Sequence, residues 1–187
     1  MQKTIFLYLI ICTCFSTGLF CQNLQLKING ASDFETTVID SLGFKKNHEN
    51  YTSIKTEVES LQKTLFKIGF IENELKFINK LNDSVFSAKI NLKTKYKTIS
   101  VYYDKSLIDS KLLSGVSKEI FEDHFKLDFS EVENVLTYIN SKITEKGFPF
   151  SKLRLSNIEI KDETNLIANL VLESSEQKRT ISNIIIK

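Results

Sequence analysis

The chain of 187 residues has little cysteine, and all of it lies near the amino terminus. The three cysteines are Cys12, Cys14 and Cys21. The chain beyond residue 21 therefore has no thiol, which excludes a disulfide framework, a cysteine-based zinc site and a cysteine nucleophile from that part. Cys12 and Cys14 stand within an apolar run, so we do not interpret them as a metal or redox motif.

Histidine and glycine are also scarce, and their positions argue against catalysis. The two histidines, His48 and His124, lie among polar and lysine-rich residues, without a second histidine or cysteine at metal-ligating spacing. We interpret His124 as a solvated surface residue. The six glycines form neither a phosphate-binding loop nor a dinucleotide fingerprint, and no nucleophile elbow is present. We therefore expect no enzymatic activity, no metal site and no cofactor.

Neither sign of charge predominates in either half of the chain. Residues 22–95 hold 11 lysines against 9 acidic residues, and residues 96–187 hold 13 lysines and arginines against 14 acidic residues. This balance excludes the excess of basic residues expected of a nucleic-acid-binding protein. The interspersed lysines and glutamates are typical of a solvated surface.

Long apolar runs are absent except for residues 5–15 (IFLYLIICTCF), which follow Lys3. In this pattern a basic residue is followed by a short apolar stretch and then by small and polar residues. It predicts a secretory signal over residues 1–21, cleaved near Cys21. An uncleaved anchor is the alternative. A lipoprotein signal is disfavoured because Phe20 stands where a small residue is needed. An exported chain without disulfides fits a bacterial envelope.

The rest of the chain contains two similar segments in the same order. LFKIGFIENELKF (65–77) is similar to ITEKGFPFSKLRL (143–155), and their glycines, Gly69 and Gly147, lie 78 residues apart. The same offset pairs the apolar positions upstream, namely Ile54 with Val132, Val58 with Leu136, Leu61 with Ile139, and Leu65 with Ile143. Downstream, at an offset drifting to 82, the paired stretches are 85–92 with 165–172, and 97–103 with 179–185. These pairs predict a tandem repeat of about 80 residues.

The first predicted unit is residues 22–95. Residues 24–28 are predicted to be a strand, and Ser32 with Glu35 form a capping box for a helix that Gly43 ends. A longer helix is predicted over residues 52–68, with Thr52 as its N-cap. The unit is completed by a predicted hairpin, with strands over 70–79 and 84–94 and a turn at Asn82 and Asp83.

The second predicted unit is residues 96–177, and it repeats this order. We expect a strand over 97–103, then a less regular helical region over 107–124 that is interrupted near Gly115. A regular helix is predicted over 130–146, opened by a capping box of Ser130 and Glu133. The last predicted elements are a hairpin of residues 148–160 with 165–174, and a final strand over 178–187.

These elements predict an α+β fold of two tandem β-α-α-β-β units. Each unit would hold a three-stranded mixed sheet with two helices on one face. Such units of about 80 residues, in tandem behind a signal, resemble the POTRA domains of the BamA/TamA-type outer-membrane protein assembly family. The most specific part is the second helix running into a glycine–aromatic pair and an alternating strand, at KIGF (67–70) and EKGF (145–148). ISNIIIK (181–187) is similar to the first strand of a third unit.

The resemblance implies a periplasmic protein–protein interaction module that receives partners by strand addition at sheet edges. It points to Glu74, Lys76, Lys152 and Arg154 as candidate edge-strand residues for partner binding. Charged residues on an edge strand also prevent promiscuous pairing, so protection is the alternative role for them.

The implied partners are unfolded outer-membrane proteins, accessory envelope proteins and a carboxy-terminal outer-membrane barrel, which this chain lacks. The residues after 175 are too few for the strands of such a barrel. We therefore expect either the amino-terminal part of a longer protein or, as the alternative function, a free-standing exported adaptor with no barrel partner.

Overall fold

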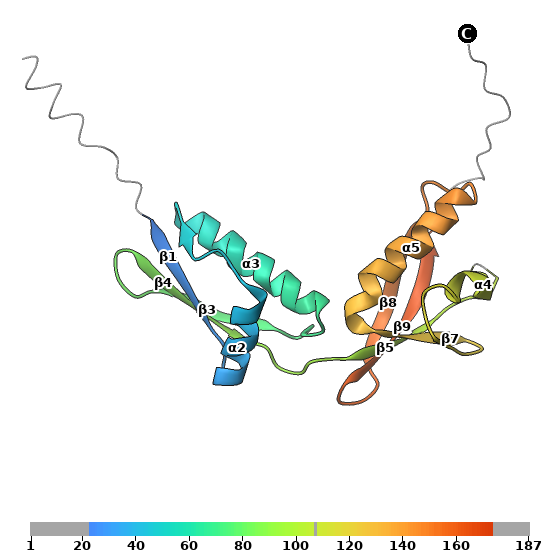
Figure 1. The fold of residues 1–187 in the computed structure, drawn as a ribbon, viewed down its shortest axis with the longest axis horizontal. Coiled ribbons are helices and arrows are strands. Elements are labelled where there is room, and N and C mark those ends of the chain that lie inside the picture. Colours follow the sequence, from blue (N-terminus) through green and yellow to red (C-terminus); the bar gives the residue numbers. More distant parts are fainter. Residues whose placement is uncertain (1–22, 107, 174–187) are drawn as a thin grey trace, which may run out of the picture. The chain divides into compact units, whose positions relative to one another are not determined.

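The computed structural model describes residues 23–106 and 108–173, and Figure 1 traces their helices and strands. The described residues form two compact units, one of residues 23–59 with 76–89, the other of residues 60–75 with 90–106 and 108–173. The boundary after residue 95, predicted from the repeat, stays a prediction. The predicted signal and the predicted strand over 181–187 lie outside the described residues.

The first sheet has the strand order β2-β1-β4-β3. Its strands are β1 (Leu24–Asn29), β2 (Asn47–His48), β3 (Glu74–Lys80) and β4 (Val85–Asn91). β1 runs parallel to β4 and antiparallel to β2, so the sheet is mixed. Burial alternates along β1, with Leu24, Leu26 and Ile28 buried and the residues between them exposed. One face of this strand is therefore covered and the other is solvated.

Two helices precede the hairpin of this sheet, α2 (Asp33–Leu42) and α3 (Tyr51–Lys67). The predicted cap of α2 is confirmed, because the Ser32 hydroxyl accepts a hydrogen bond from the Glu35 amide at 3.2 Å. The predicted cap of α3 is wrong. Asn50 replaces Thr52 as the cap, since its side-chain oxygen accepts from the Ser53 amide at 2.9 Å. An asparagine side chain reaches the third helical amide from this position.

The apolar stripe predicted for α3 is confirmed. All four of its members are buried, namely Ile54, Val58, Leu61 and Leu65. The turn predicted between β3 and β4 is confirmed as well, because the Asn82 side chain accepts from the amides of Ser84 and Val85 at 3.0 and 2.9 Å. β3 begins at Glu74 rather than residue 70, because Asn73 holds a turn by donating to the Phe70 carbonyl at 2.8 Å.

The second sheet has the strand order β6-β7-β5-β9-β8. Its strands are β5 (Thr98–Tyr102), β6 (Glu119–Ile120), β7 (His124–Asp128), β8 (Lys152–Ile160) and β9 (Asn165–Glu173). β5 lies parallel to β9 and antiparallel to β7, with Val101 opposite both Ala168 and Phe125. The α+β class with mixed sheets is confirmed. Among the described residues the sheets have four and five strands rather than three, because β2, β6 and β7 extend them.

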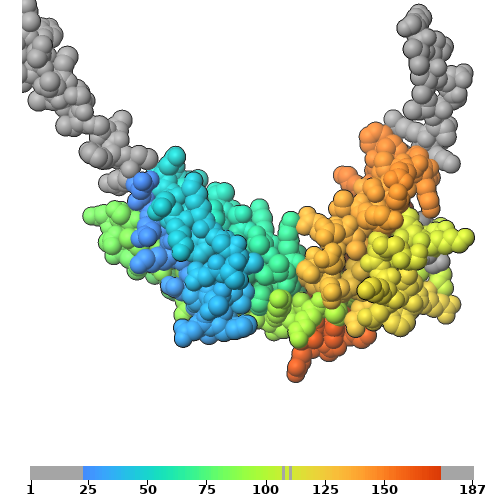
Figure 2. Space-filling model, in the orientation of Figure 1, coloured from blue at the N-terminus to red at the C-terminus, as the bar shows by residue number. Residues whose placement is uncertain are grey.

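The helical region predicted over 107–124 is mostly wrong. Its described residues contain only the short helix α4 (Ser110–Leu113), which is followed by the antiparallel strands β6 and β7. The Ser117 hydroxyl donates to the Lys126 carbonyl at 2.7 Å and ties the two strands together. Figure 2 shows the coloured part of this segment (yellow) at the surface, beside the following helix (orange).

The helix predicted over 130–146 is confirmed as α5 (Val132–Glu145), but its predicted capping box is wrong. A 3-10 turn, Phe129–Glu131, precedes α5, and no side-chain cap forms at the start of either. The Phe129 amide instead donates to the Lys97 carbonyl at 2.8 Å. The Lys97 carbonyl thus satisfies the first amide of the 3-10 turn.

The predicted stripe of α5 is confirmed for Ile139 and Ile143, which are buried. Val135 is the third buried residue, whereas Val132 and Leu136 are half-buried against the same core. This core also contains Phe125, Leu127 and Leu166, which β7 and β9 supply. The buried face of α5 is therefore rotated slightly from the face that the repeat predicted.

Candidate partner-binding edges

β3 lies at the edge of the first sheet, with β4 as its neighbour on one side. Glu74 and Lys76, two of the predicted binding residues, lie on this strand and are exposed. The Glu74 carboxylate lies 3.6 Å from the Lys93 ammonium. Phe77 is also exposed, at 43%. This edge therefore presents both charged and aromatic side chains.

The hairpin turn keeps β3 against β4. Lys80 donates to the Asp83 carboxylate at 2.9 Å, and this hydrogen bond holds the pKa of Asp83 below its ordinary value. The Leu81 amide donates to the Val85 carbonyl at 2.8 Å, which closes the hairpin. The ion pair is exposed, so it holds the turn in place but contributes little to the free energy of folding.

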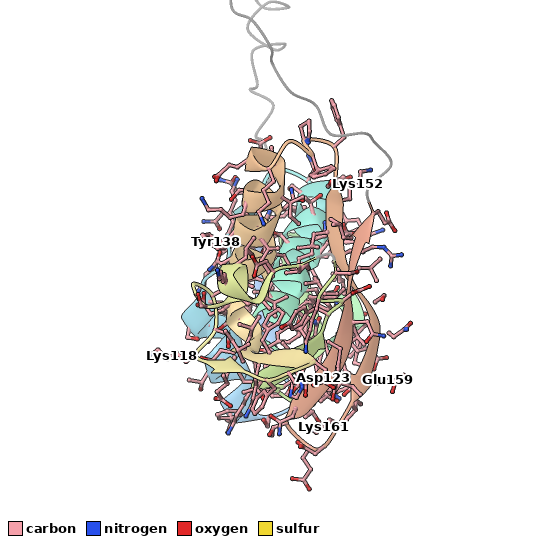
Figure 3. All side chains as sticks on the ribbon, turned by 90° about the vertical axis from the view of Figure 1, so that its right-hand side faces the viewer. Lys118, Asp123, Tyr138, Lys152, Glu159 and Lys161 are labelled. Atoms are coloured by element: carbon pink, nitrogen blue, oxygen red, sulfur yellow. The ribbon has the colours of Figure 1, made fainter. Side chains whose placement is uncertain are left out.

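β8 lies at the edge of the second sheet, beside β9. The strand begins at Lys152 rather than residue 148, because a turn comes first in which the Ser151 amide donates to the Phe148 carbonyl at 3.3 Å. Pro149 occupies the second position of that turn, where its fixed φ is favourable. Figure 3 labels Lys152 and Glu159 toward the two ends of β8, along the margin of the sheet.

The other two predicted residues, Lys152 and Arg154, are exposed on β8. Lys152 stands opposite Glu173 of β9, and the Arg154 guanidinium donates to the Glu173 carboxylate at 2.6 Å. Leu153 and Leu155 alternate with them and pack against the core beneath α5. The predicted division of this strand into a charged face and a packed face is therefore confirmed.

The structure brings the four predicted residues to two different edges, not to a single site. Glu74 and Lys76 lie on β3, while Lys152 and Arg154 lie on β8.

A bulge in β8 was not predicted. The register with β9 shifts between Ser156 and Glu159, and Asn157 has a positive φ of 49°. Beyond it, Ile158 and Ile160 are 46% and 58% exposed. The sequence carries a signal for it, because the apolar alternation of KLRLSNIEI changes phase after Leu155.

The two histidines differ in environment. His48 is only 2% exposed, so its polar neighbourhood in sequence did not indicate burial. The interpretation of His124 as solvated surface is also wrong. Its ring stacks on Phe121 at 4.5 Å and lies 4.9 Å from the Tyr102 ring, between centroids. Its Nδ1 lies 2.7 Å from the Asp123 carboxylate, a hydrogen bond that lowers the pKa of Asp123.

Within the described part of the chain, no group of three or more histidine, cysteine, aspartate or glutamate side chains could hold a metal ion. Over the same residues, the structure contains no helix with the length and apolar character needed to cross a membrane.

No model of a known protein family matches the chain, and no curated protein matches its sequence. Among solved structures, the crystal structure of POTRA domains 3–5 of BamA from Haemophilus influenzae gives a TM-score of 0.54 at 16% sequence identity. That comparison covers 85% of this chain and 70% of the other. The chain has the POTRA fold.

Two further structures give lower scores. BamA from Haemophilus ducreyi lacking POTRA domains 1–3 has a TM-score of 0.48 at 12% identity, over 79% of this chain and 29% of that one. CdiB from Escherichia coli has a TM-score of 0.32 at 13% identity, over 83% of this chain and 28% of the other. The comparison with POTRA domains 3–5 of BamA confirms, at the level of the fold, the POTRA resemblance seen in the sequence.

Proposed function

We propose that this chain is a periplasmic protein–protein interaction module, part of the POTRA arm of an outer-membrane assembly or export protein. Its POTRA domains would receive unfolded outer-membrane proteins or accessory envelope proteins as added strands at β3 and β8. The observation that carries the proposal is the edge position of both strands, each with one neighbouring strand among the described residues. An extended partner can pair with the open side of such a strand through main-chain hydrogen bonds.

Of the two edge strands, β8 has the features that suit strand addition better. Leu153 and Leu155 anchor the strand to the core, so it stays in place without a partner. Past the bulge, Ile158 and Ile160 offer exposed apolar surface to the side chains of an incoming strand. Backbone pairing would supply the affinity, and these isoleucines would supply a preference for apolar partners.

The charged residues of β8 have two roles within this proposal. Arg154 is engaged by Glu173 on the same hairpin, which suits a residue that keeps the edge from promiscuous pairing. Lys152 has no ion-pair partner among the described residues and lies at the start of the strand. We therefore assign partner contact to Lys152 and protection to Arg154.

Site-specific crosslinking tests the proposal. A photoreactive side chain at Lys152 or Arg154 of the full chain should crosslink to purified unfolded outer-membrane proteins and to extended peptides. Lys142, an exposed position on α5 paired with Glu145, is the control position. Crosslinking at the β8 positions no stronger than at Lys142 would remove strand addition from the proposed function.

A backbone variant complements the crosslinks. Lys152→Pro removes the main-chain amide donor at the first residue of β8, a place where a proline is tolerated. We expect weaker partner capture with little change in the melting temperature. Leu153→Pro is the matched control, because it should damage the fold by displacing a side chain packed on the core.

The periplasmic location rests on the segment over residues 1–21, which has the pattern of a secretory signal. Cell fractionation of the full chain should recover a processed protein in the envelope. Recovery of the unprocessed chain in the cytoplasm would contradict this location.

A further inference from the structure

The bulge in β8 decides which side chains of this strand share a face. Before the bulge Leu155 stands opposite Leu170 of β9, and after it Ile160 stands opposite Leu166. Leu166 and Leu170 both belong to the buried core, and directly opposite residues of an antiparallel pair lie on one face. Ile160 therefore shares a face with Leu155, although an odd number of positions separates them and a regular strand would place them on opposite faces.

The charged side chains of β8 are brought together on the other face in the same way. Arg154 stands opposite Val171, and Glu159 stands opposite Ile167. Val171 and Ile167 are an even number of positions apart on β9, so both lie on one face. That face of β8 therefore has a cation before the bulge and an anion after it, and Figure 3 labels Glu159 in this second half of the strand.

These two faces make β8 complementary to a second copy of itself. In an antiparallel pairing that places Ser156 opposite Asn157 of the other copy, each half of the strand meets the half with matching residues. The opposed pairs are Leu153 with Ile160, Arg154 with Glu159, Leu155 with Ile158, and Ser156 with Asn157. A two-fold axis repeats every pair, so the contact is isologous and closes after two copies. The bulge lies at this axis, so apolar residues meet on one face and charged residues on the other.

The apolar pairs cover surface that a single copy exposes. Ile158 and Ile160 are 46% and 58% exposed on an edge strand. Their counterparts in the pairing, Leu153 and Leu155, are half-buried and already packed against the core. Each copy would thus lay its exposed isoleucines beside two leucines that are held in place, and burial of this apolar surface favours association.

The charged pair is available for the same contact. In the described part of the chain Glu159 makes no ion pair. Arg154 already donates to Glu173 at 2.6 Å, but a guanidinium has five N–H donors and can bind a second carboxylate. The pair between Arg154 and Glu159 of the other copy would form twice, once on each side of the axis. Opposite charges directly across two antiparallel strands stabilise their pairing.

We propose that two copies of this chain associate through β8, antiparallel to one another, about a two-fold axis between Ser156 and Asn157. Main-chain hydrogen bonds along the open side of β8 would join the second sheets of the two copies into one. Lys152 would stand opposite Lys161 at each end, and these like charges confine the paired region to the residues between them. This association goes beyond the proposed function and does not depend on it, because it needs no client.

Charge reversal in the full chain tests the pairing, with sedimentation equilibrium as the measurement. Arg154→Glu and Glu159→Arg each replace two attractive pairs by two repulsive ones, so each should raise the dissociation constant of the dimer by about tenfold or more. An equimolar mixture of the two variants should form a heterodimer, because every charged pair in it is again of opposite sign. The double variant should dimerise for the same reason, and this recovery separates lost pairing from misfolding.

Glu119→Arg is the matched control for charge. Glu119 lies on β6 at the other edge of the same sheet, where its carboxylate is 3.8 Å from the Lys126 ammonium. This change should leave the dissociation constant of the dimer unchanged. The proposal is overturned if the wild-type chain stays monomeric at its highest soluble concentration, if the control weakens association as much as the β8 variants, or if neither the mixture nor the double variant recovers it.

Disulfide formation between two different variants tests the register. Both variants carry serine at Cys12, Cys14 and Cys21, and one has Lys152→Cys while the other has Lys161→Cys. Directly opposite residues lie close enough for a disulfide, so the mixture should crosslink under mild oxidation. Neither variant should crosslink with itself, because its two cysteines would lie nine positions, or about 30 Å, apart along the paired strands. Self-crosslinking as strong as that of the mixture would contradict the antiparallel register.

The two proposals for β8 fail in different ways. If extended peptides crosslink to Lys152 but charge reversal leaves self-association unchanged, β8 receives clients and the pairing of two copies is overturned. If the dimer responds to charge reversal as expected and no client crosslinks, the pairing of two copies stands and strand addition by clients at β8 is removed.

Discussion

The backbone of Gly69 is in direct contact with the backbone of Tyr96. The Gly69 carbonyl accepts a hydrogen bond from the Tyr96 amide at 2.9 Å, and a Cβ on Gly69 would lie 2.1 Å from the Tyr96 carbonyl oxygen. Tyr96 is buried, and its hydroxyl donates to Glu72 at 3.0 Å. Burial, and then this bond, raise the pKa of Tyr96. The glycine that ends α3 therefore also holds the chain that enters β5.

Gly69→Ala should be severely destabilising for two reasons. The position has a φ of 103°, which disfavours alanine, and the added methyl meets backbone that cannot move aside locally. Together these effects predict a loss of roughly 2–5 kcal/mol in the free energy of unfolding. Gly43→Ala is the control, because its φ is 70° but nothing lies within 4 Å of the added methyl. Denaturant melts that show equal losses for both would refute the steric contact.

Ile139→Ala tests the core of the second unit. Ile139 is 0% exposed on α5, so its truncation should cost roughly 2–5 kcal/mol in denaturant melts. Leu136, which was predicted for the same stripe, is only half-buried against that core. Leu136→Ala should therefore reduce the free energy of unfolding by less. The reverse order of the two losses would contradict the observed rotation of α5.

Asp162 gives the β8–β9 hairpin a predictable pH dependence. Its carboxylate accepts from the Asn165 side chain at 2.7 and 2.8 Å and from the Thr164 amide at 3.1 Å. These bonds, the side-chain one foremost, hold the pKa of Asp162 below its ordinary value of 3.8. The ionised group is stabilising at neutral pH, and this contribution is lost as the pH falls through the lowered pKa.

The measurement is the melting temperature of the wild type and of Asp162→Ala across pH. The wild type should be the more stable at neutral pH, and the difference should shrink below about pH 4, where the carboxylate of the unfolded chain begins to take up a proton. Glu163→Ala removes the same charge from the neighbouring exposed residue and serves as the control. A difference that grows on acidification would contradict the hydrogen-bonded turn.

Much of the fold could be predicted because its signals are local. The stripe from Ile54 to Leu65 recurs at helical spacing, and Ser32 and Asn82 lie at positions where their side chains satisfy nearby amides. The alternation of Lys152 to Leu155 likewise indicates an edge strand with one packed face. These elements need no knowledge of distant residues.

The segment over 107–124 could not be predicted in the same way. Its apolar residues fit more than one period, and its structure depends on distant pairings such as Phe125 with Val101. The burial of His48 has a similar cause, because β2 is only two residues long and exists through its pairing with β1. The β8 bulge is likewise defined by its register with β9. Non-local pairing is invisible to a window of neighbouring residues.

The exposed isoleucines of β8 allow the binding proposal to be tested without disturbing the fold. Ile158→Lys and Ile160→Lys place charges where an incoming strand would lay its apolar side chains. Because these residues are 46% and 58% exposed, each change should alter the free energy of unfolding by no more than about 0.5 kcal/mol.

Binding of an extended apolar peptide by the double variant should weaken by about tenfold, as measured by fluorescence titration, since one buried isoleucine contributes at least that much. Phe34→Lys provides the control, because Phe34 is 72% exposed and lies on α2 rather than on either edge strand. If Phe34→Lys weakens binding while the β8 variant does not, the partner binds α2 rather than the edge. Weakening confined to the β8 variant is the outcome that strand addition at β8 requires, because Ile158 and Ile160 are exposed apolar side chains on that edge strand.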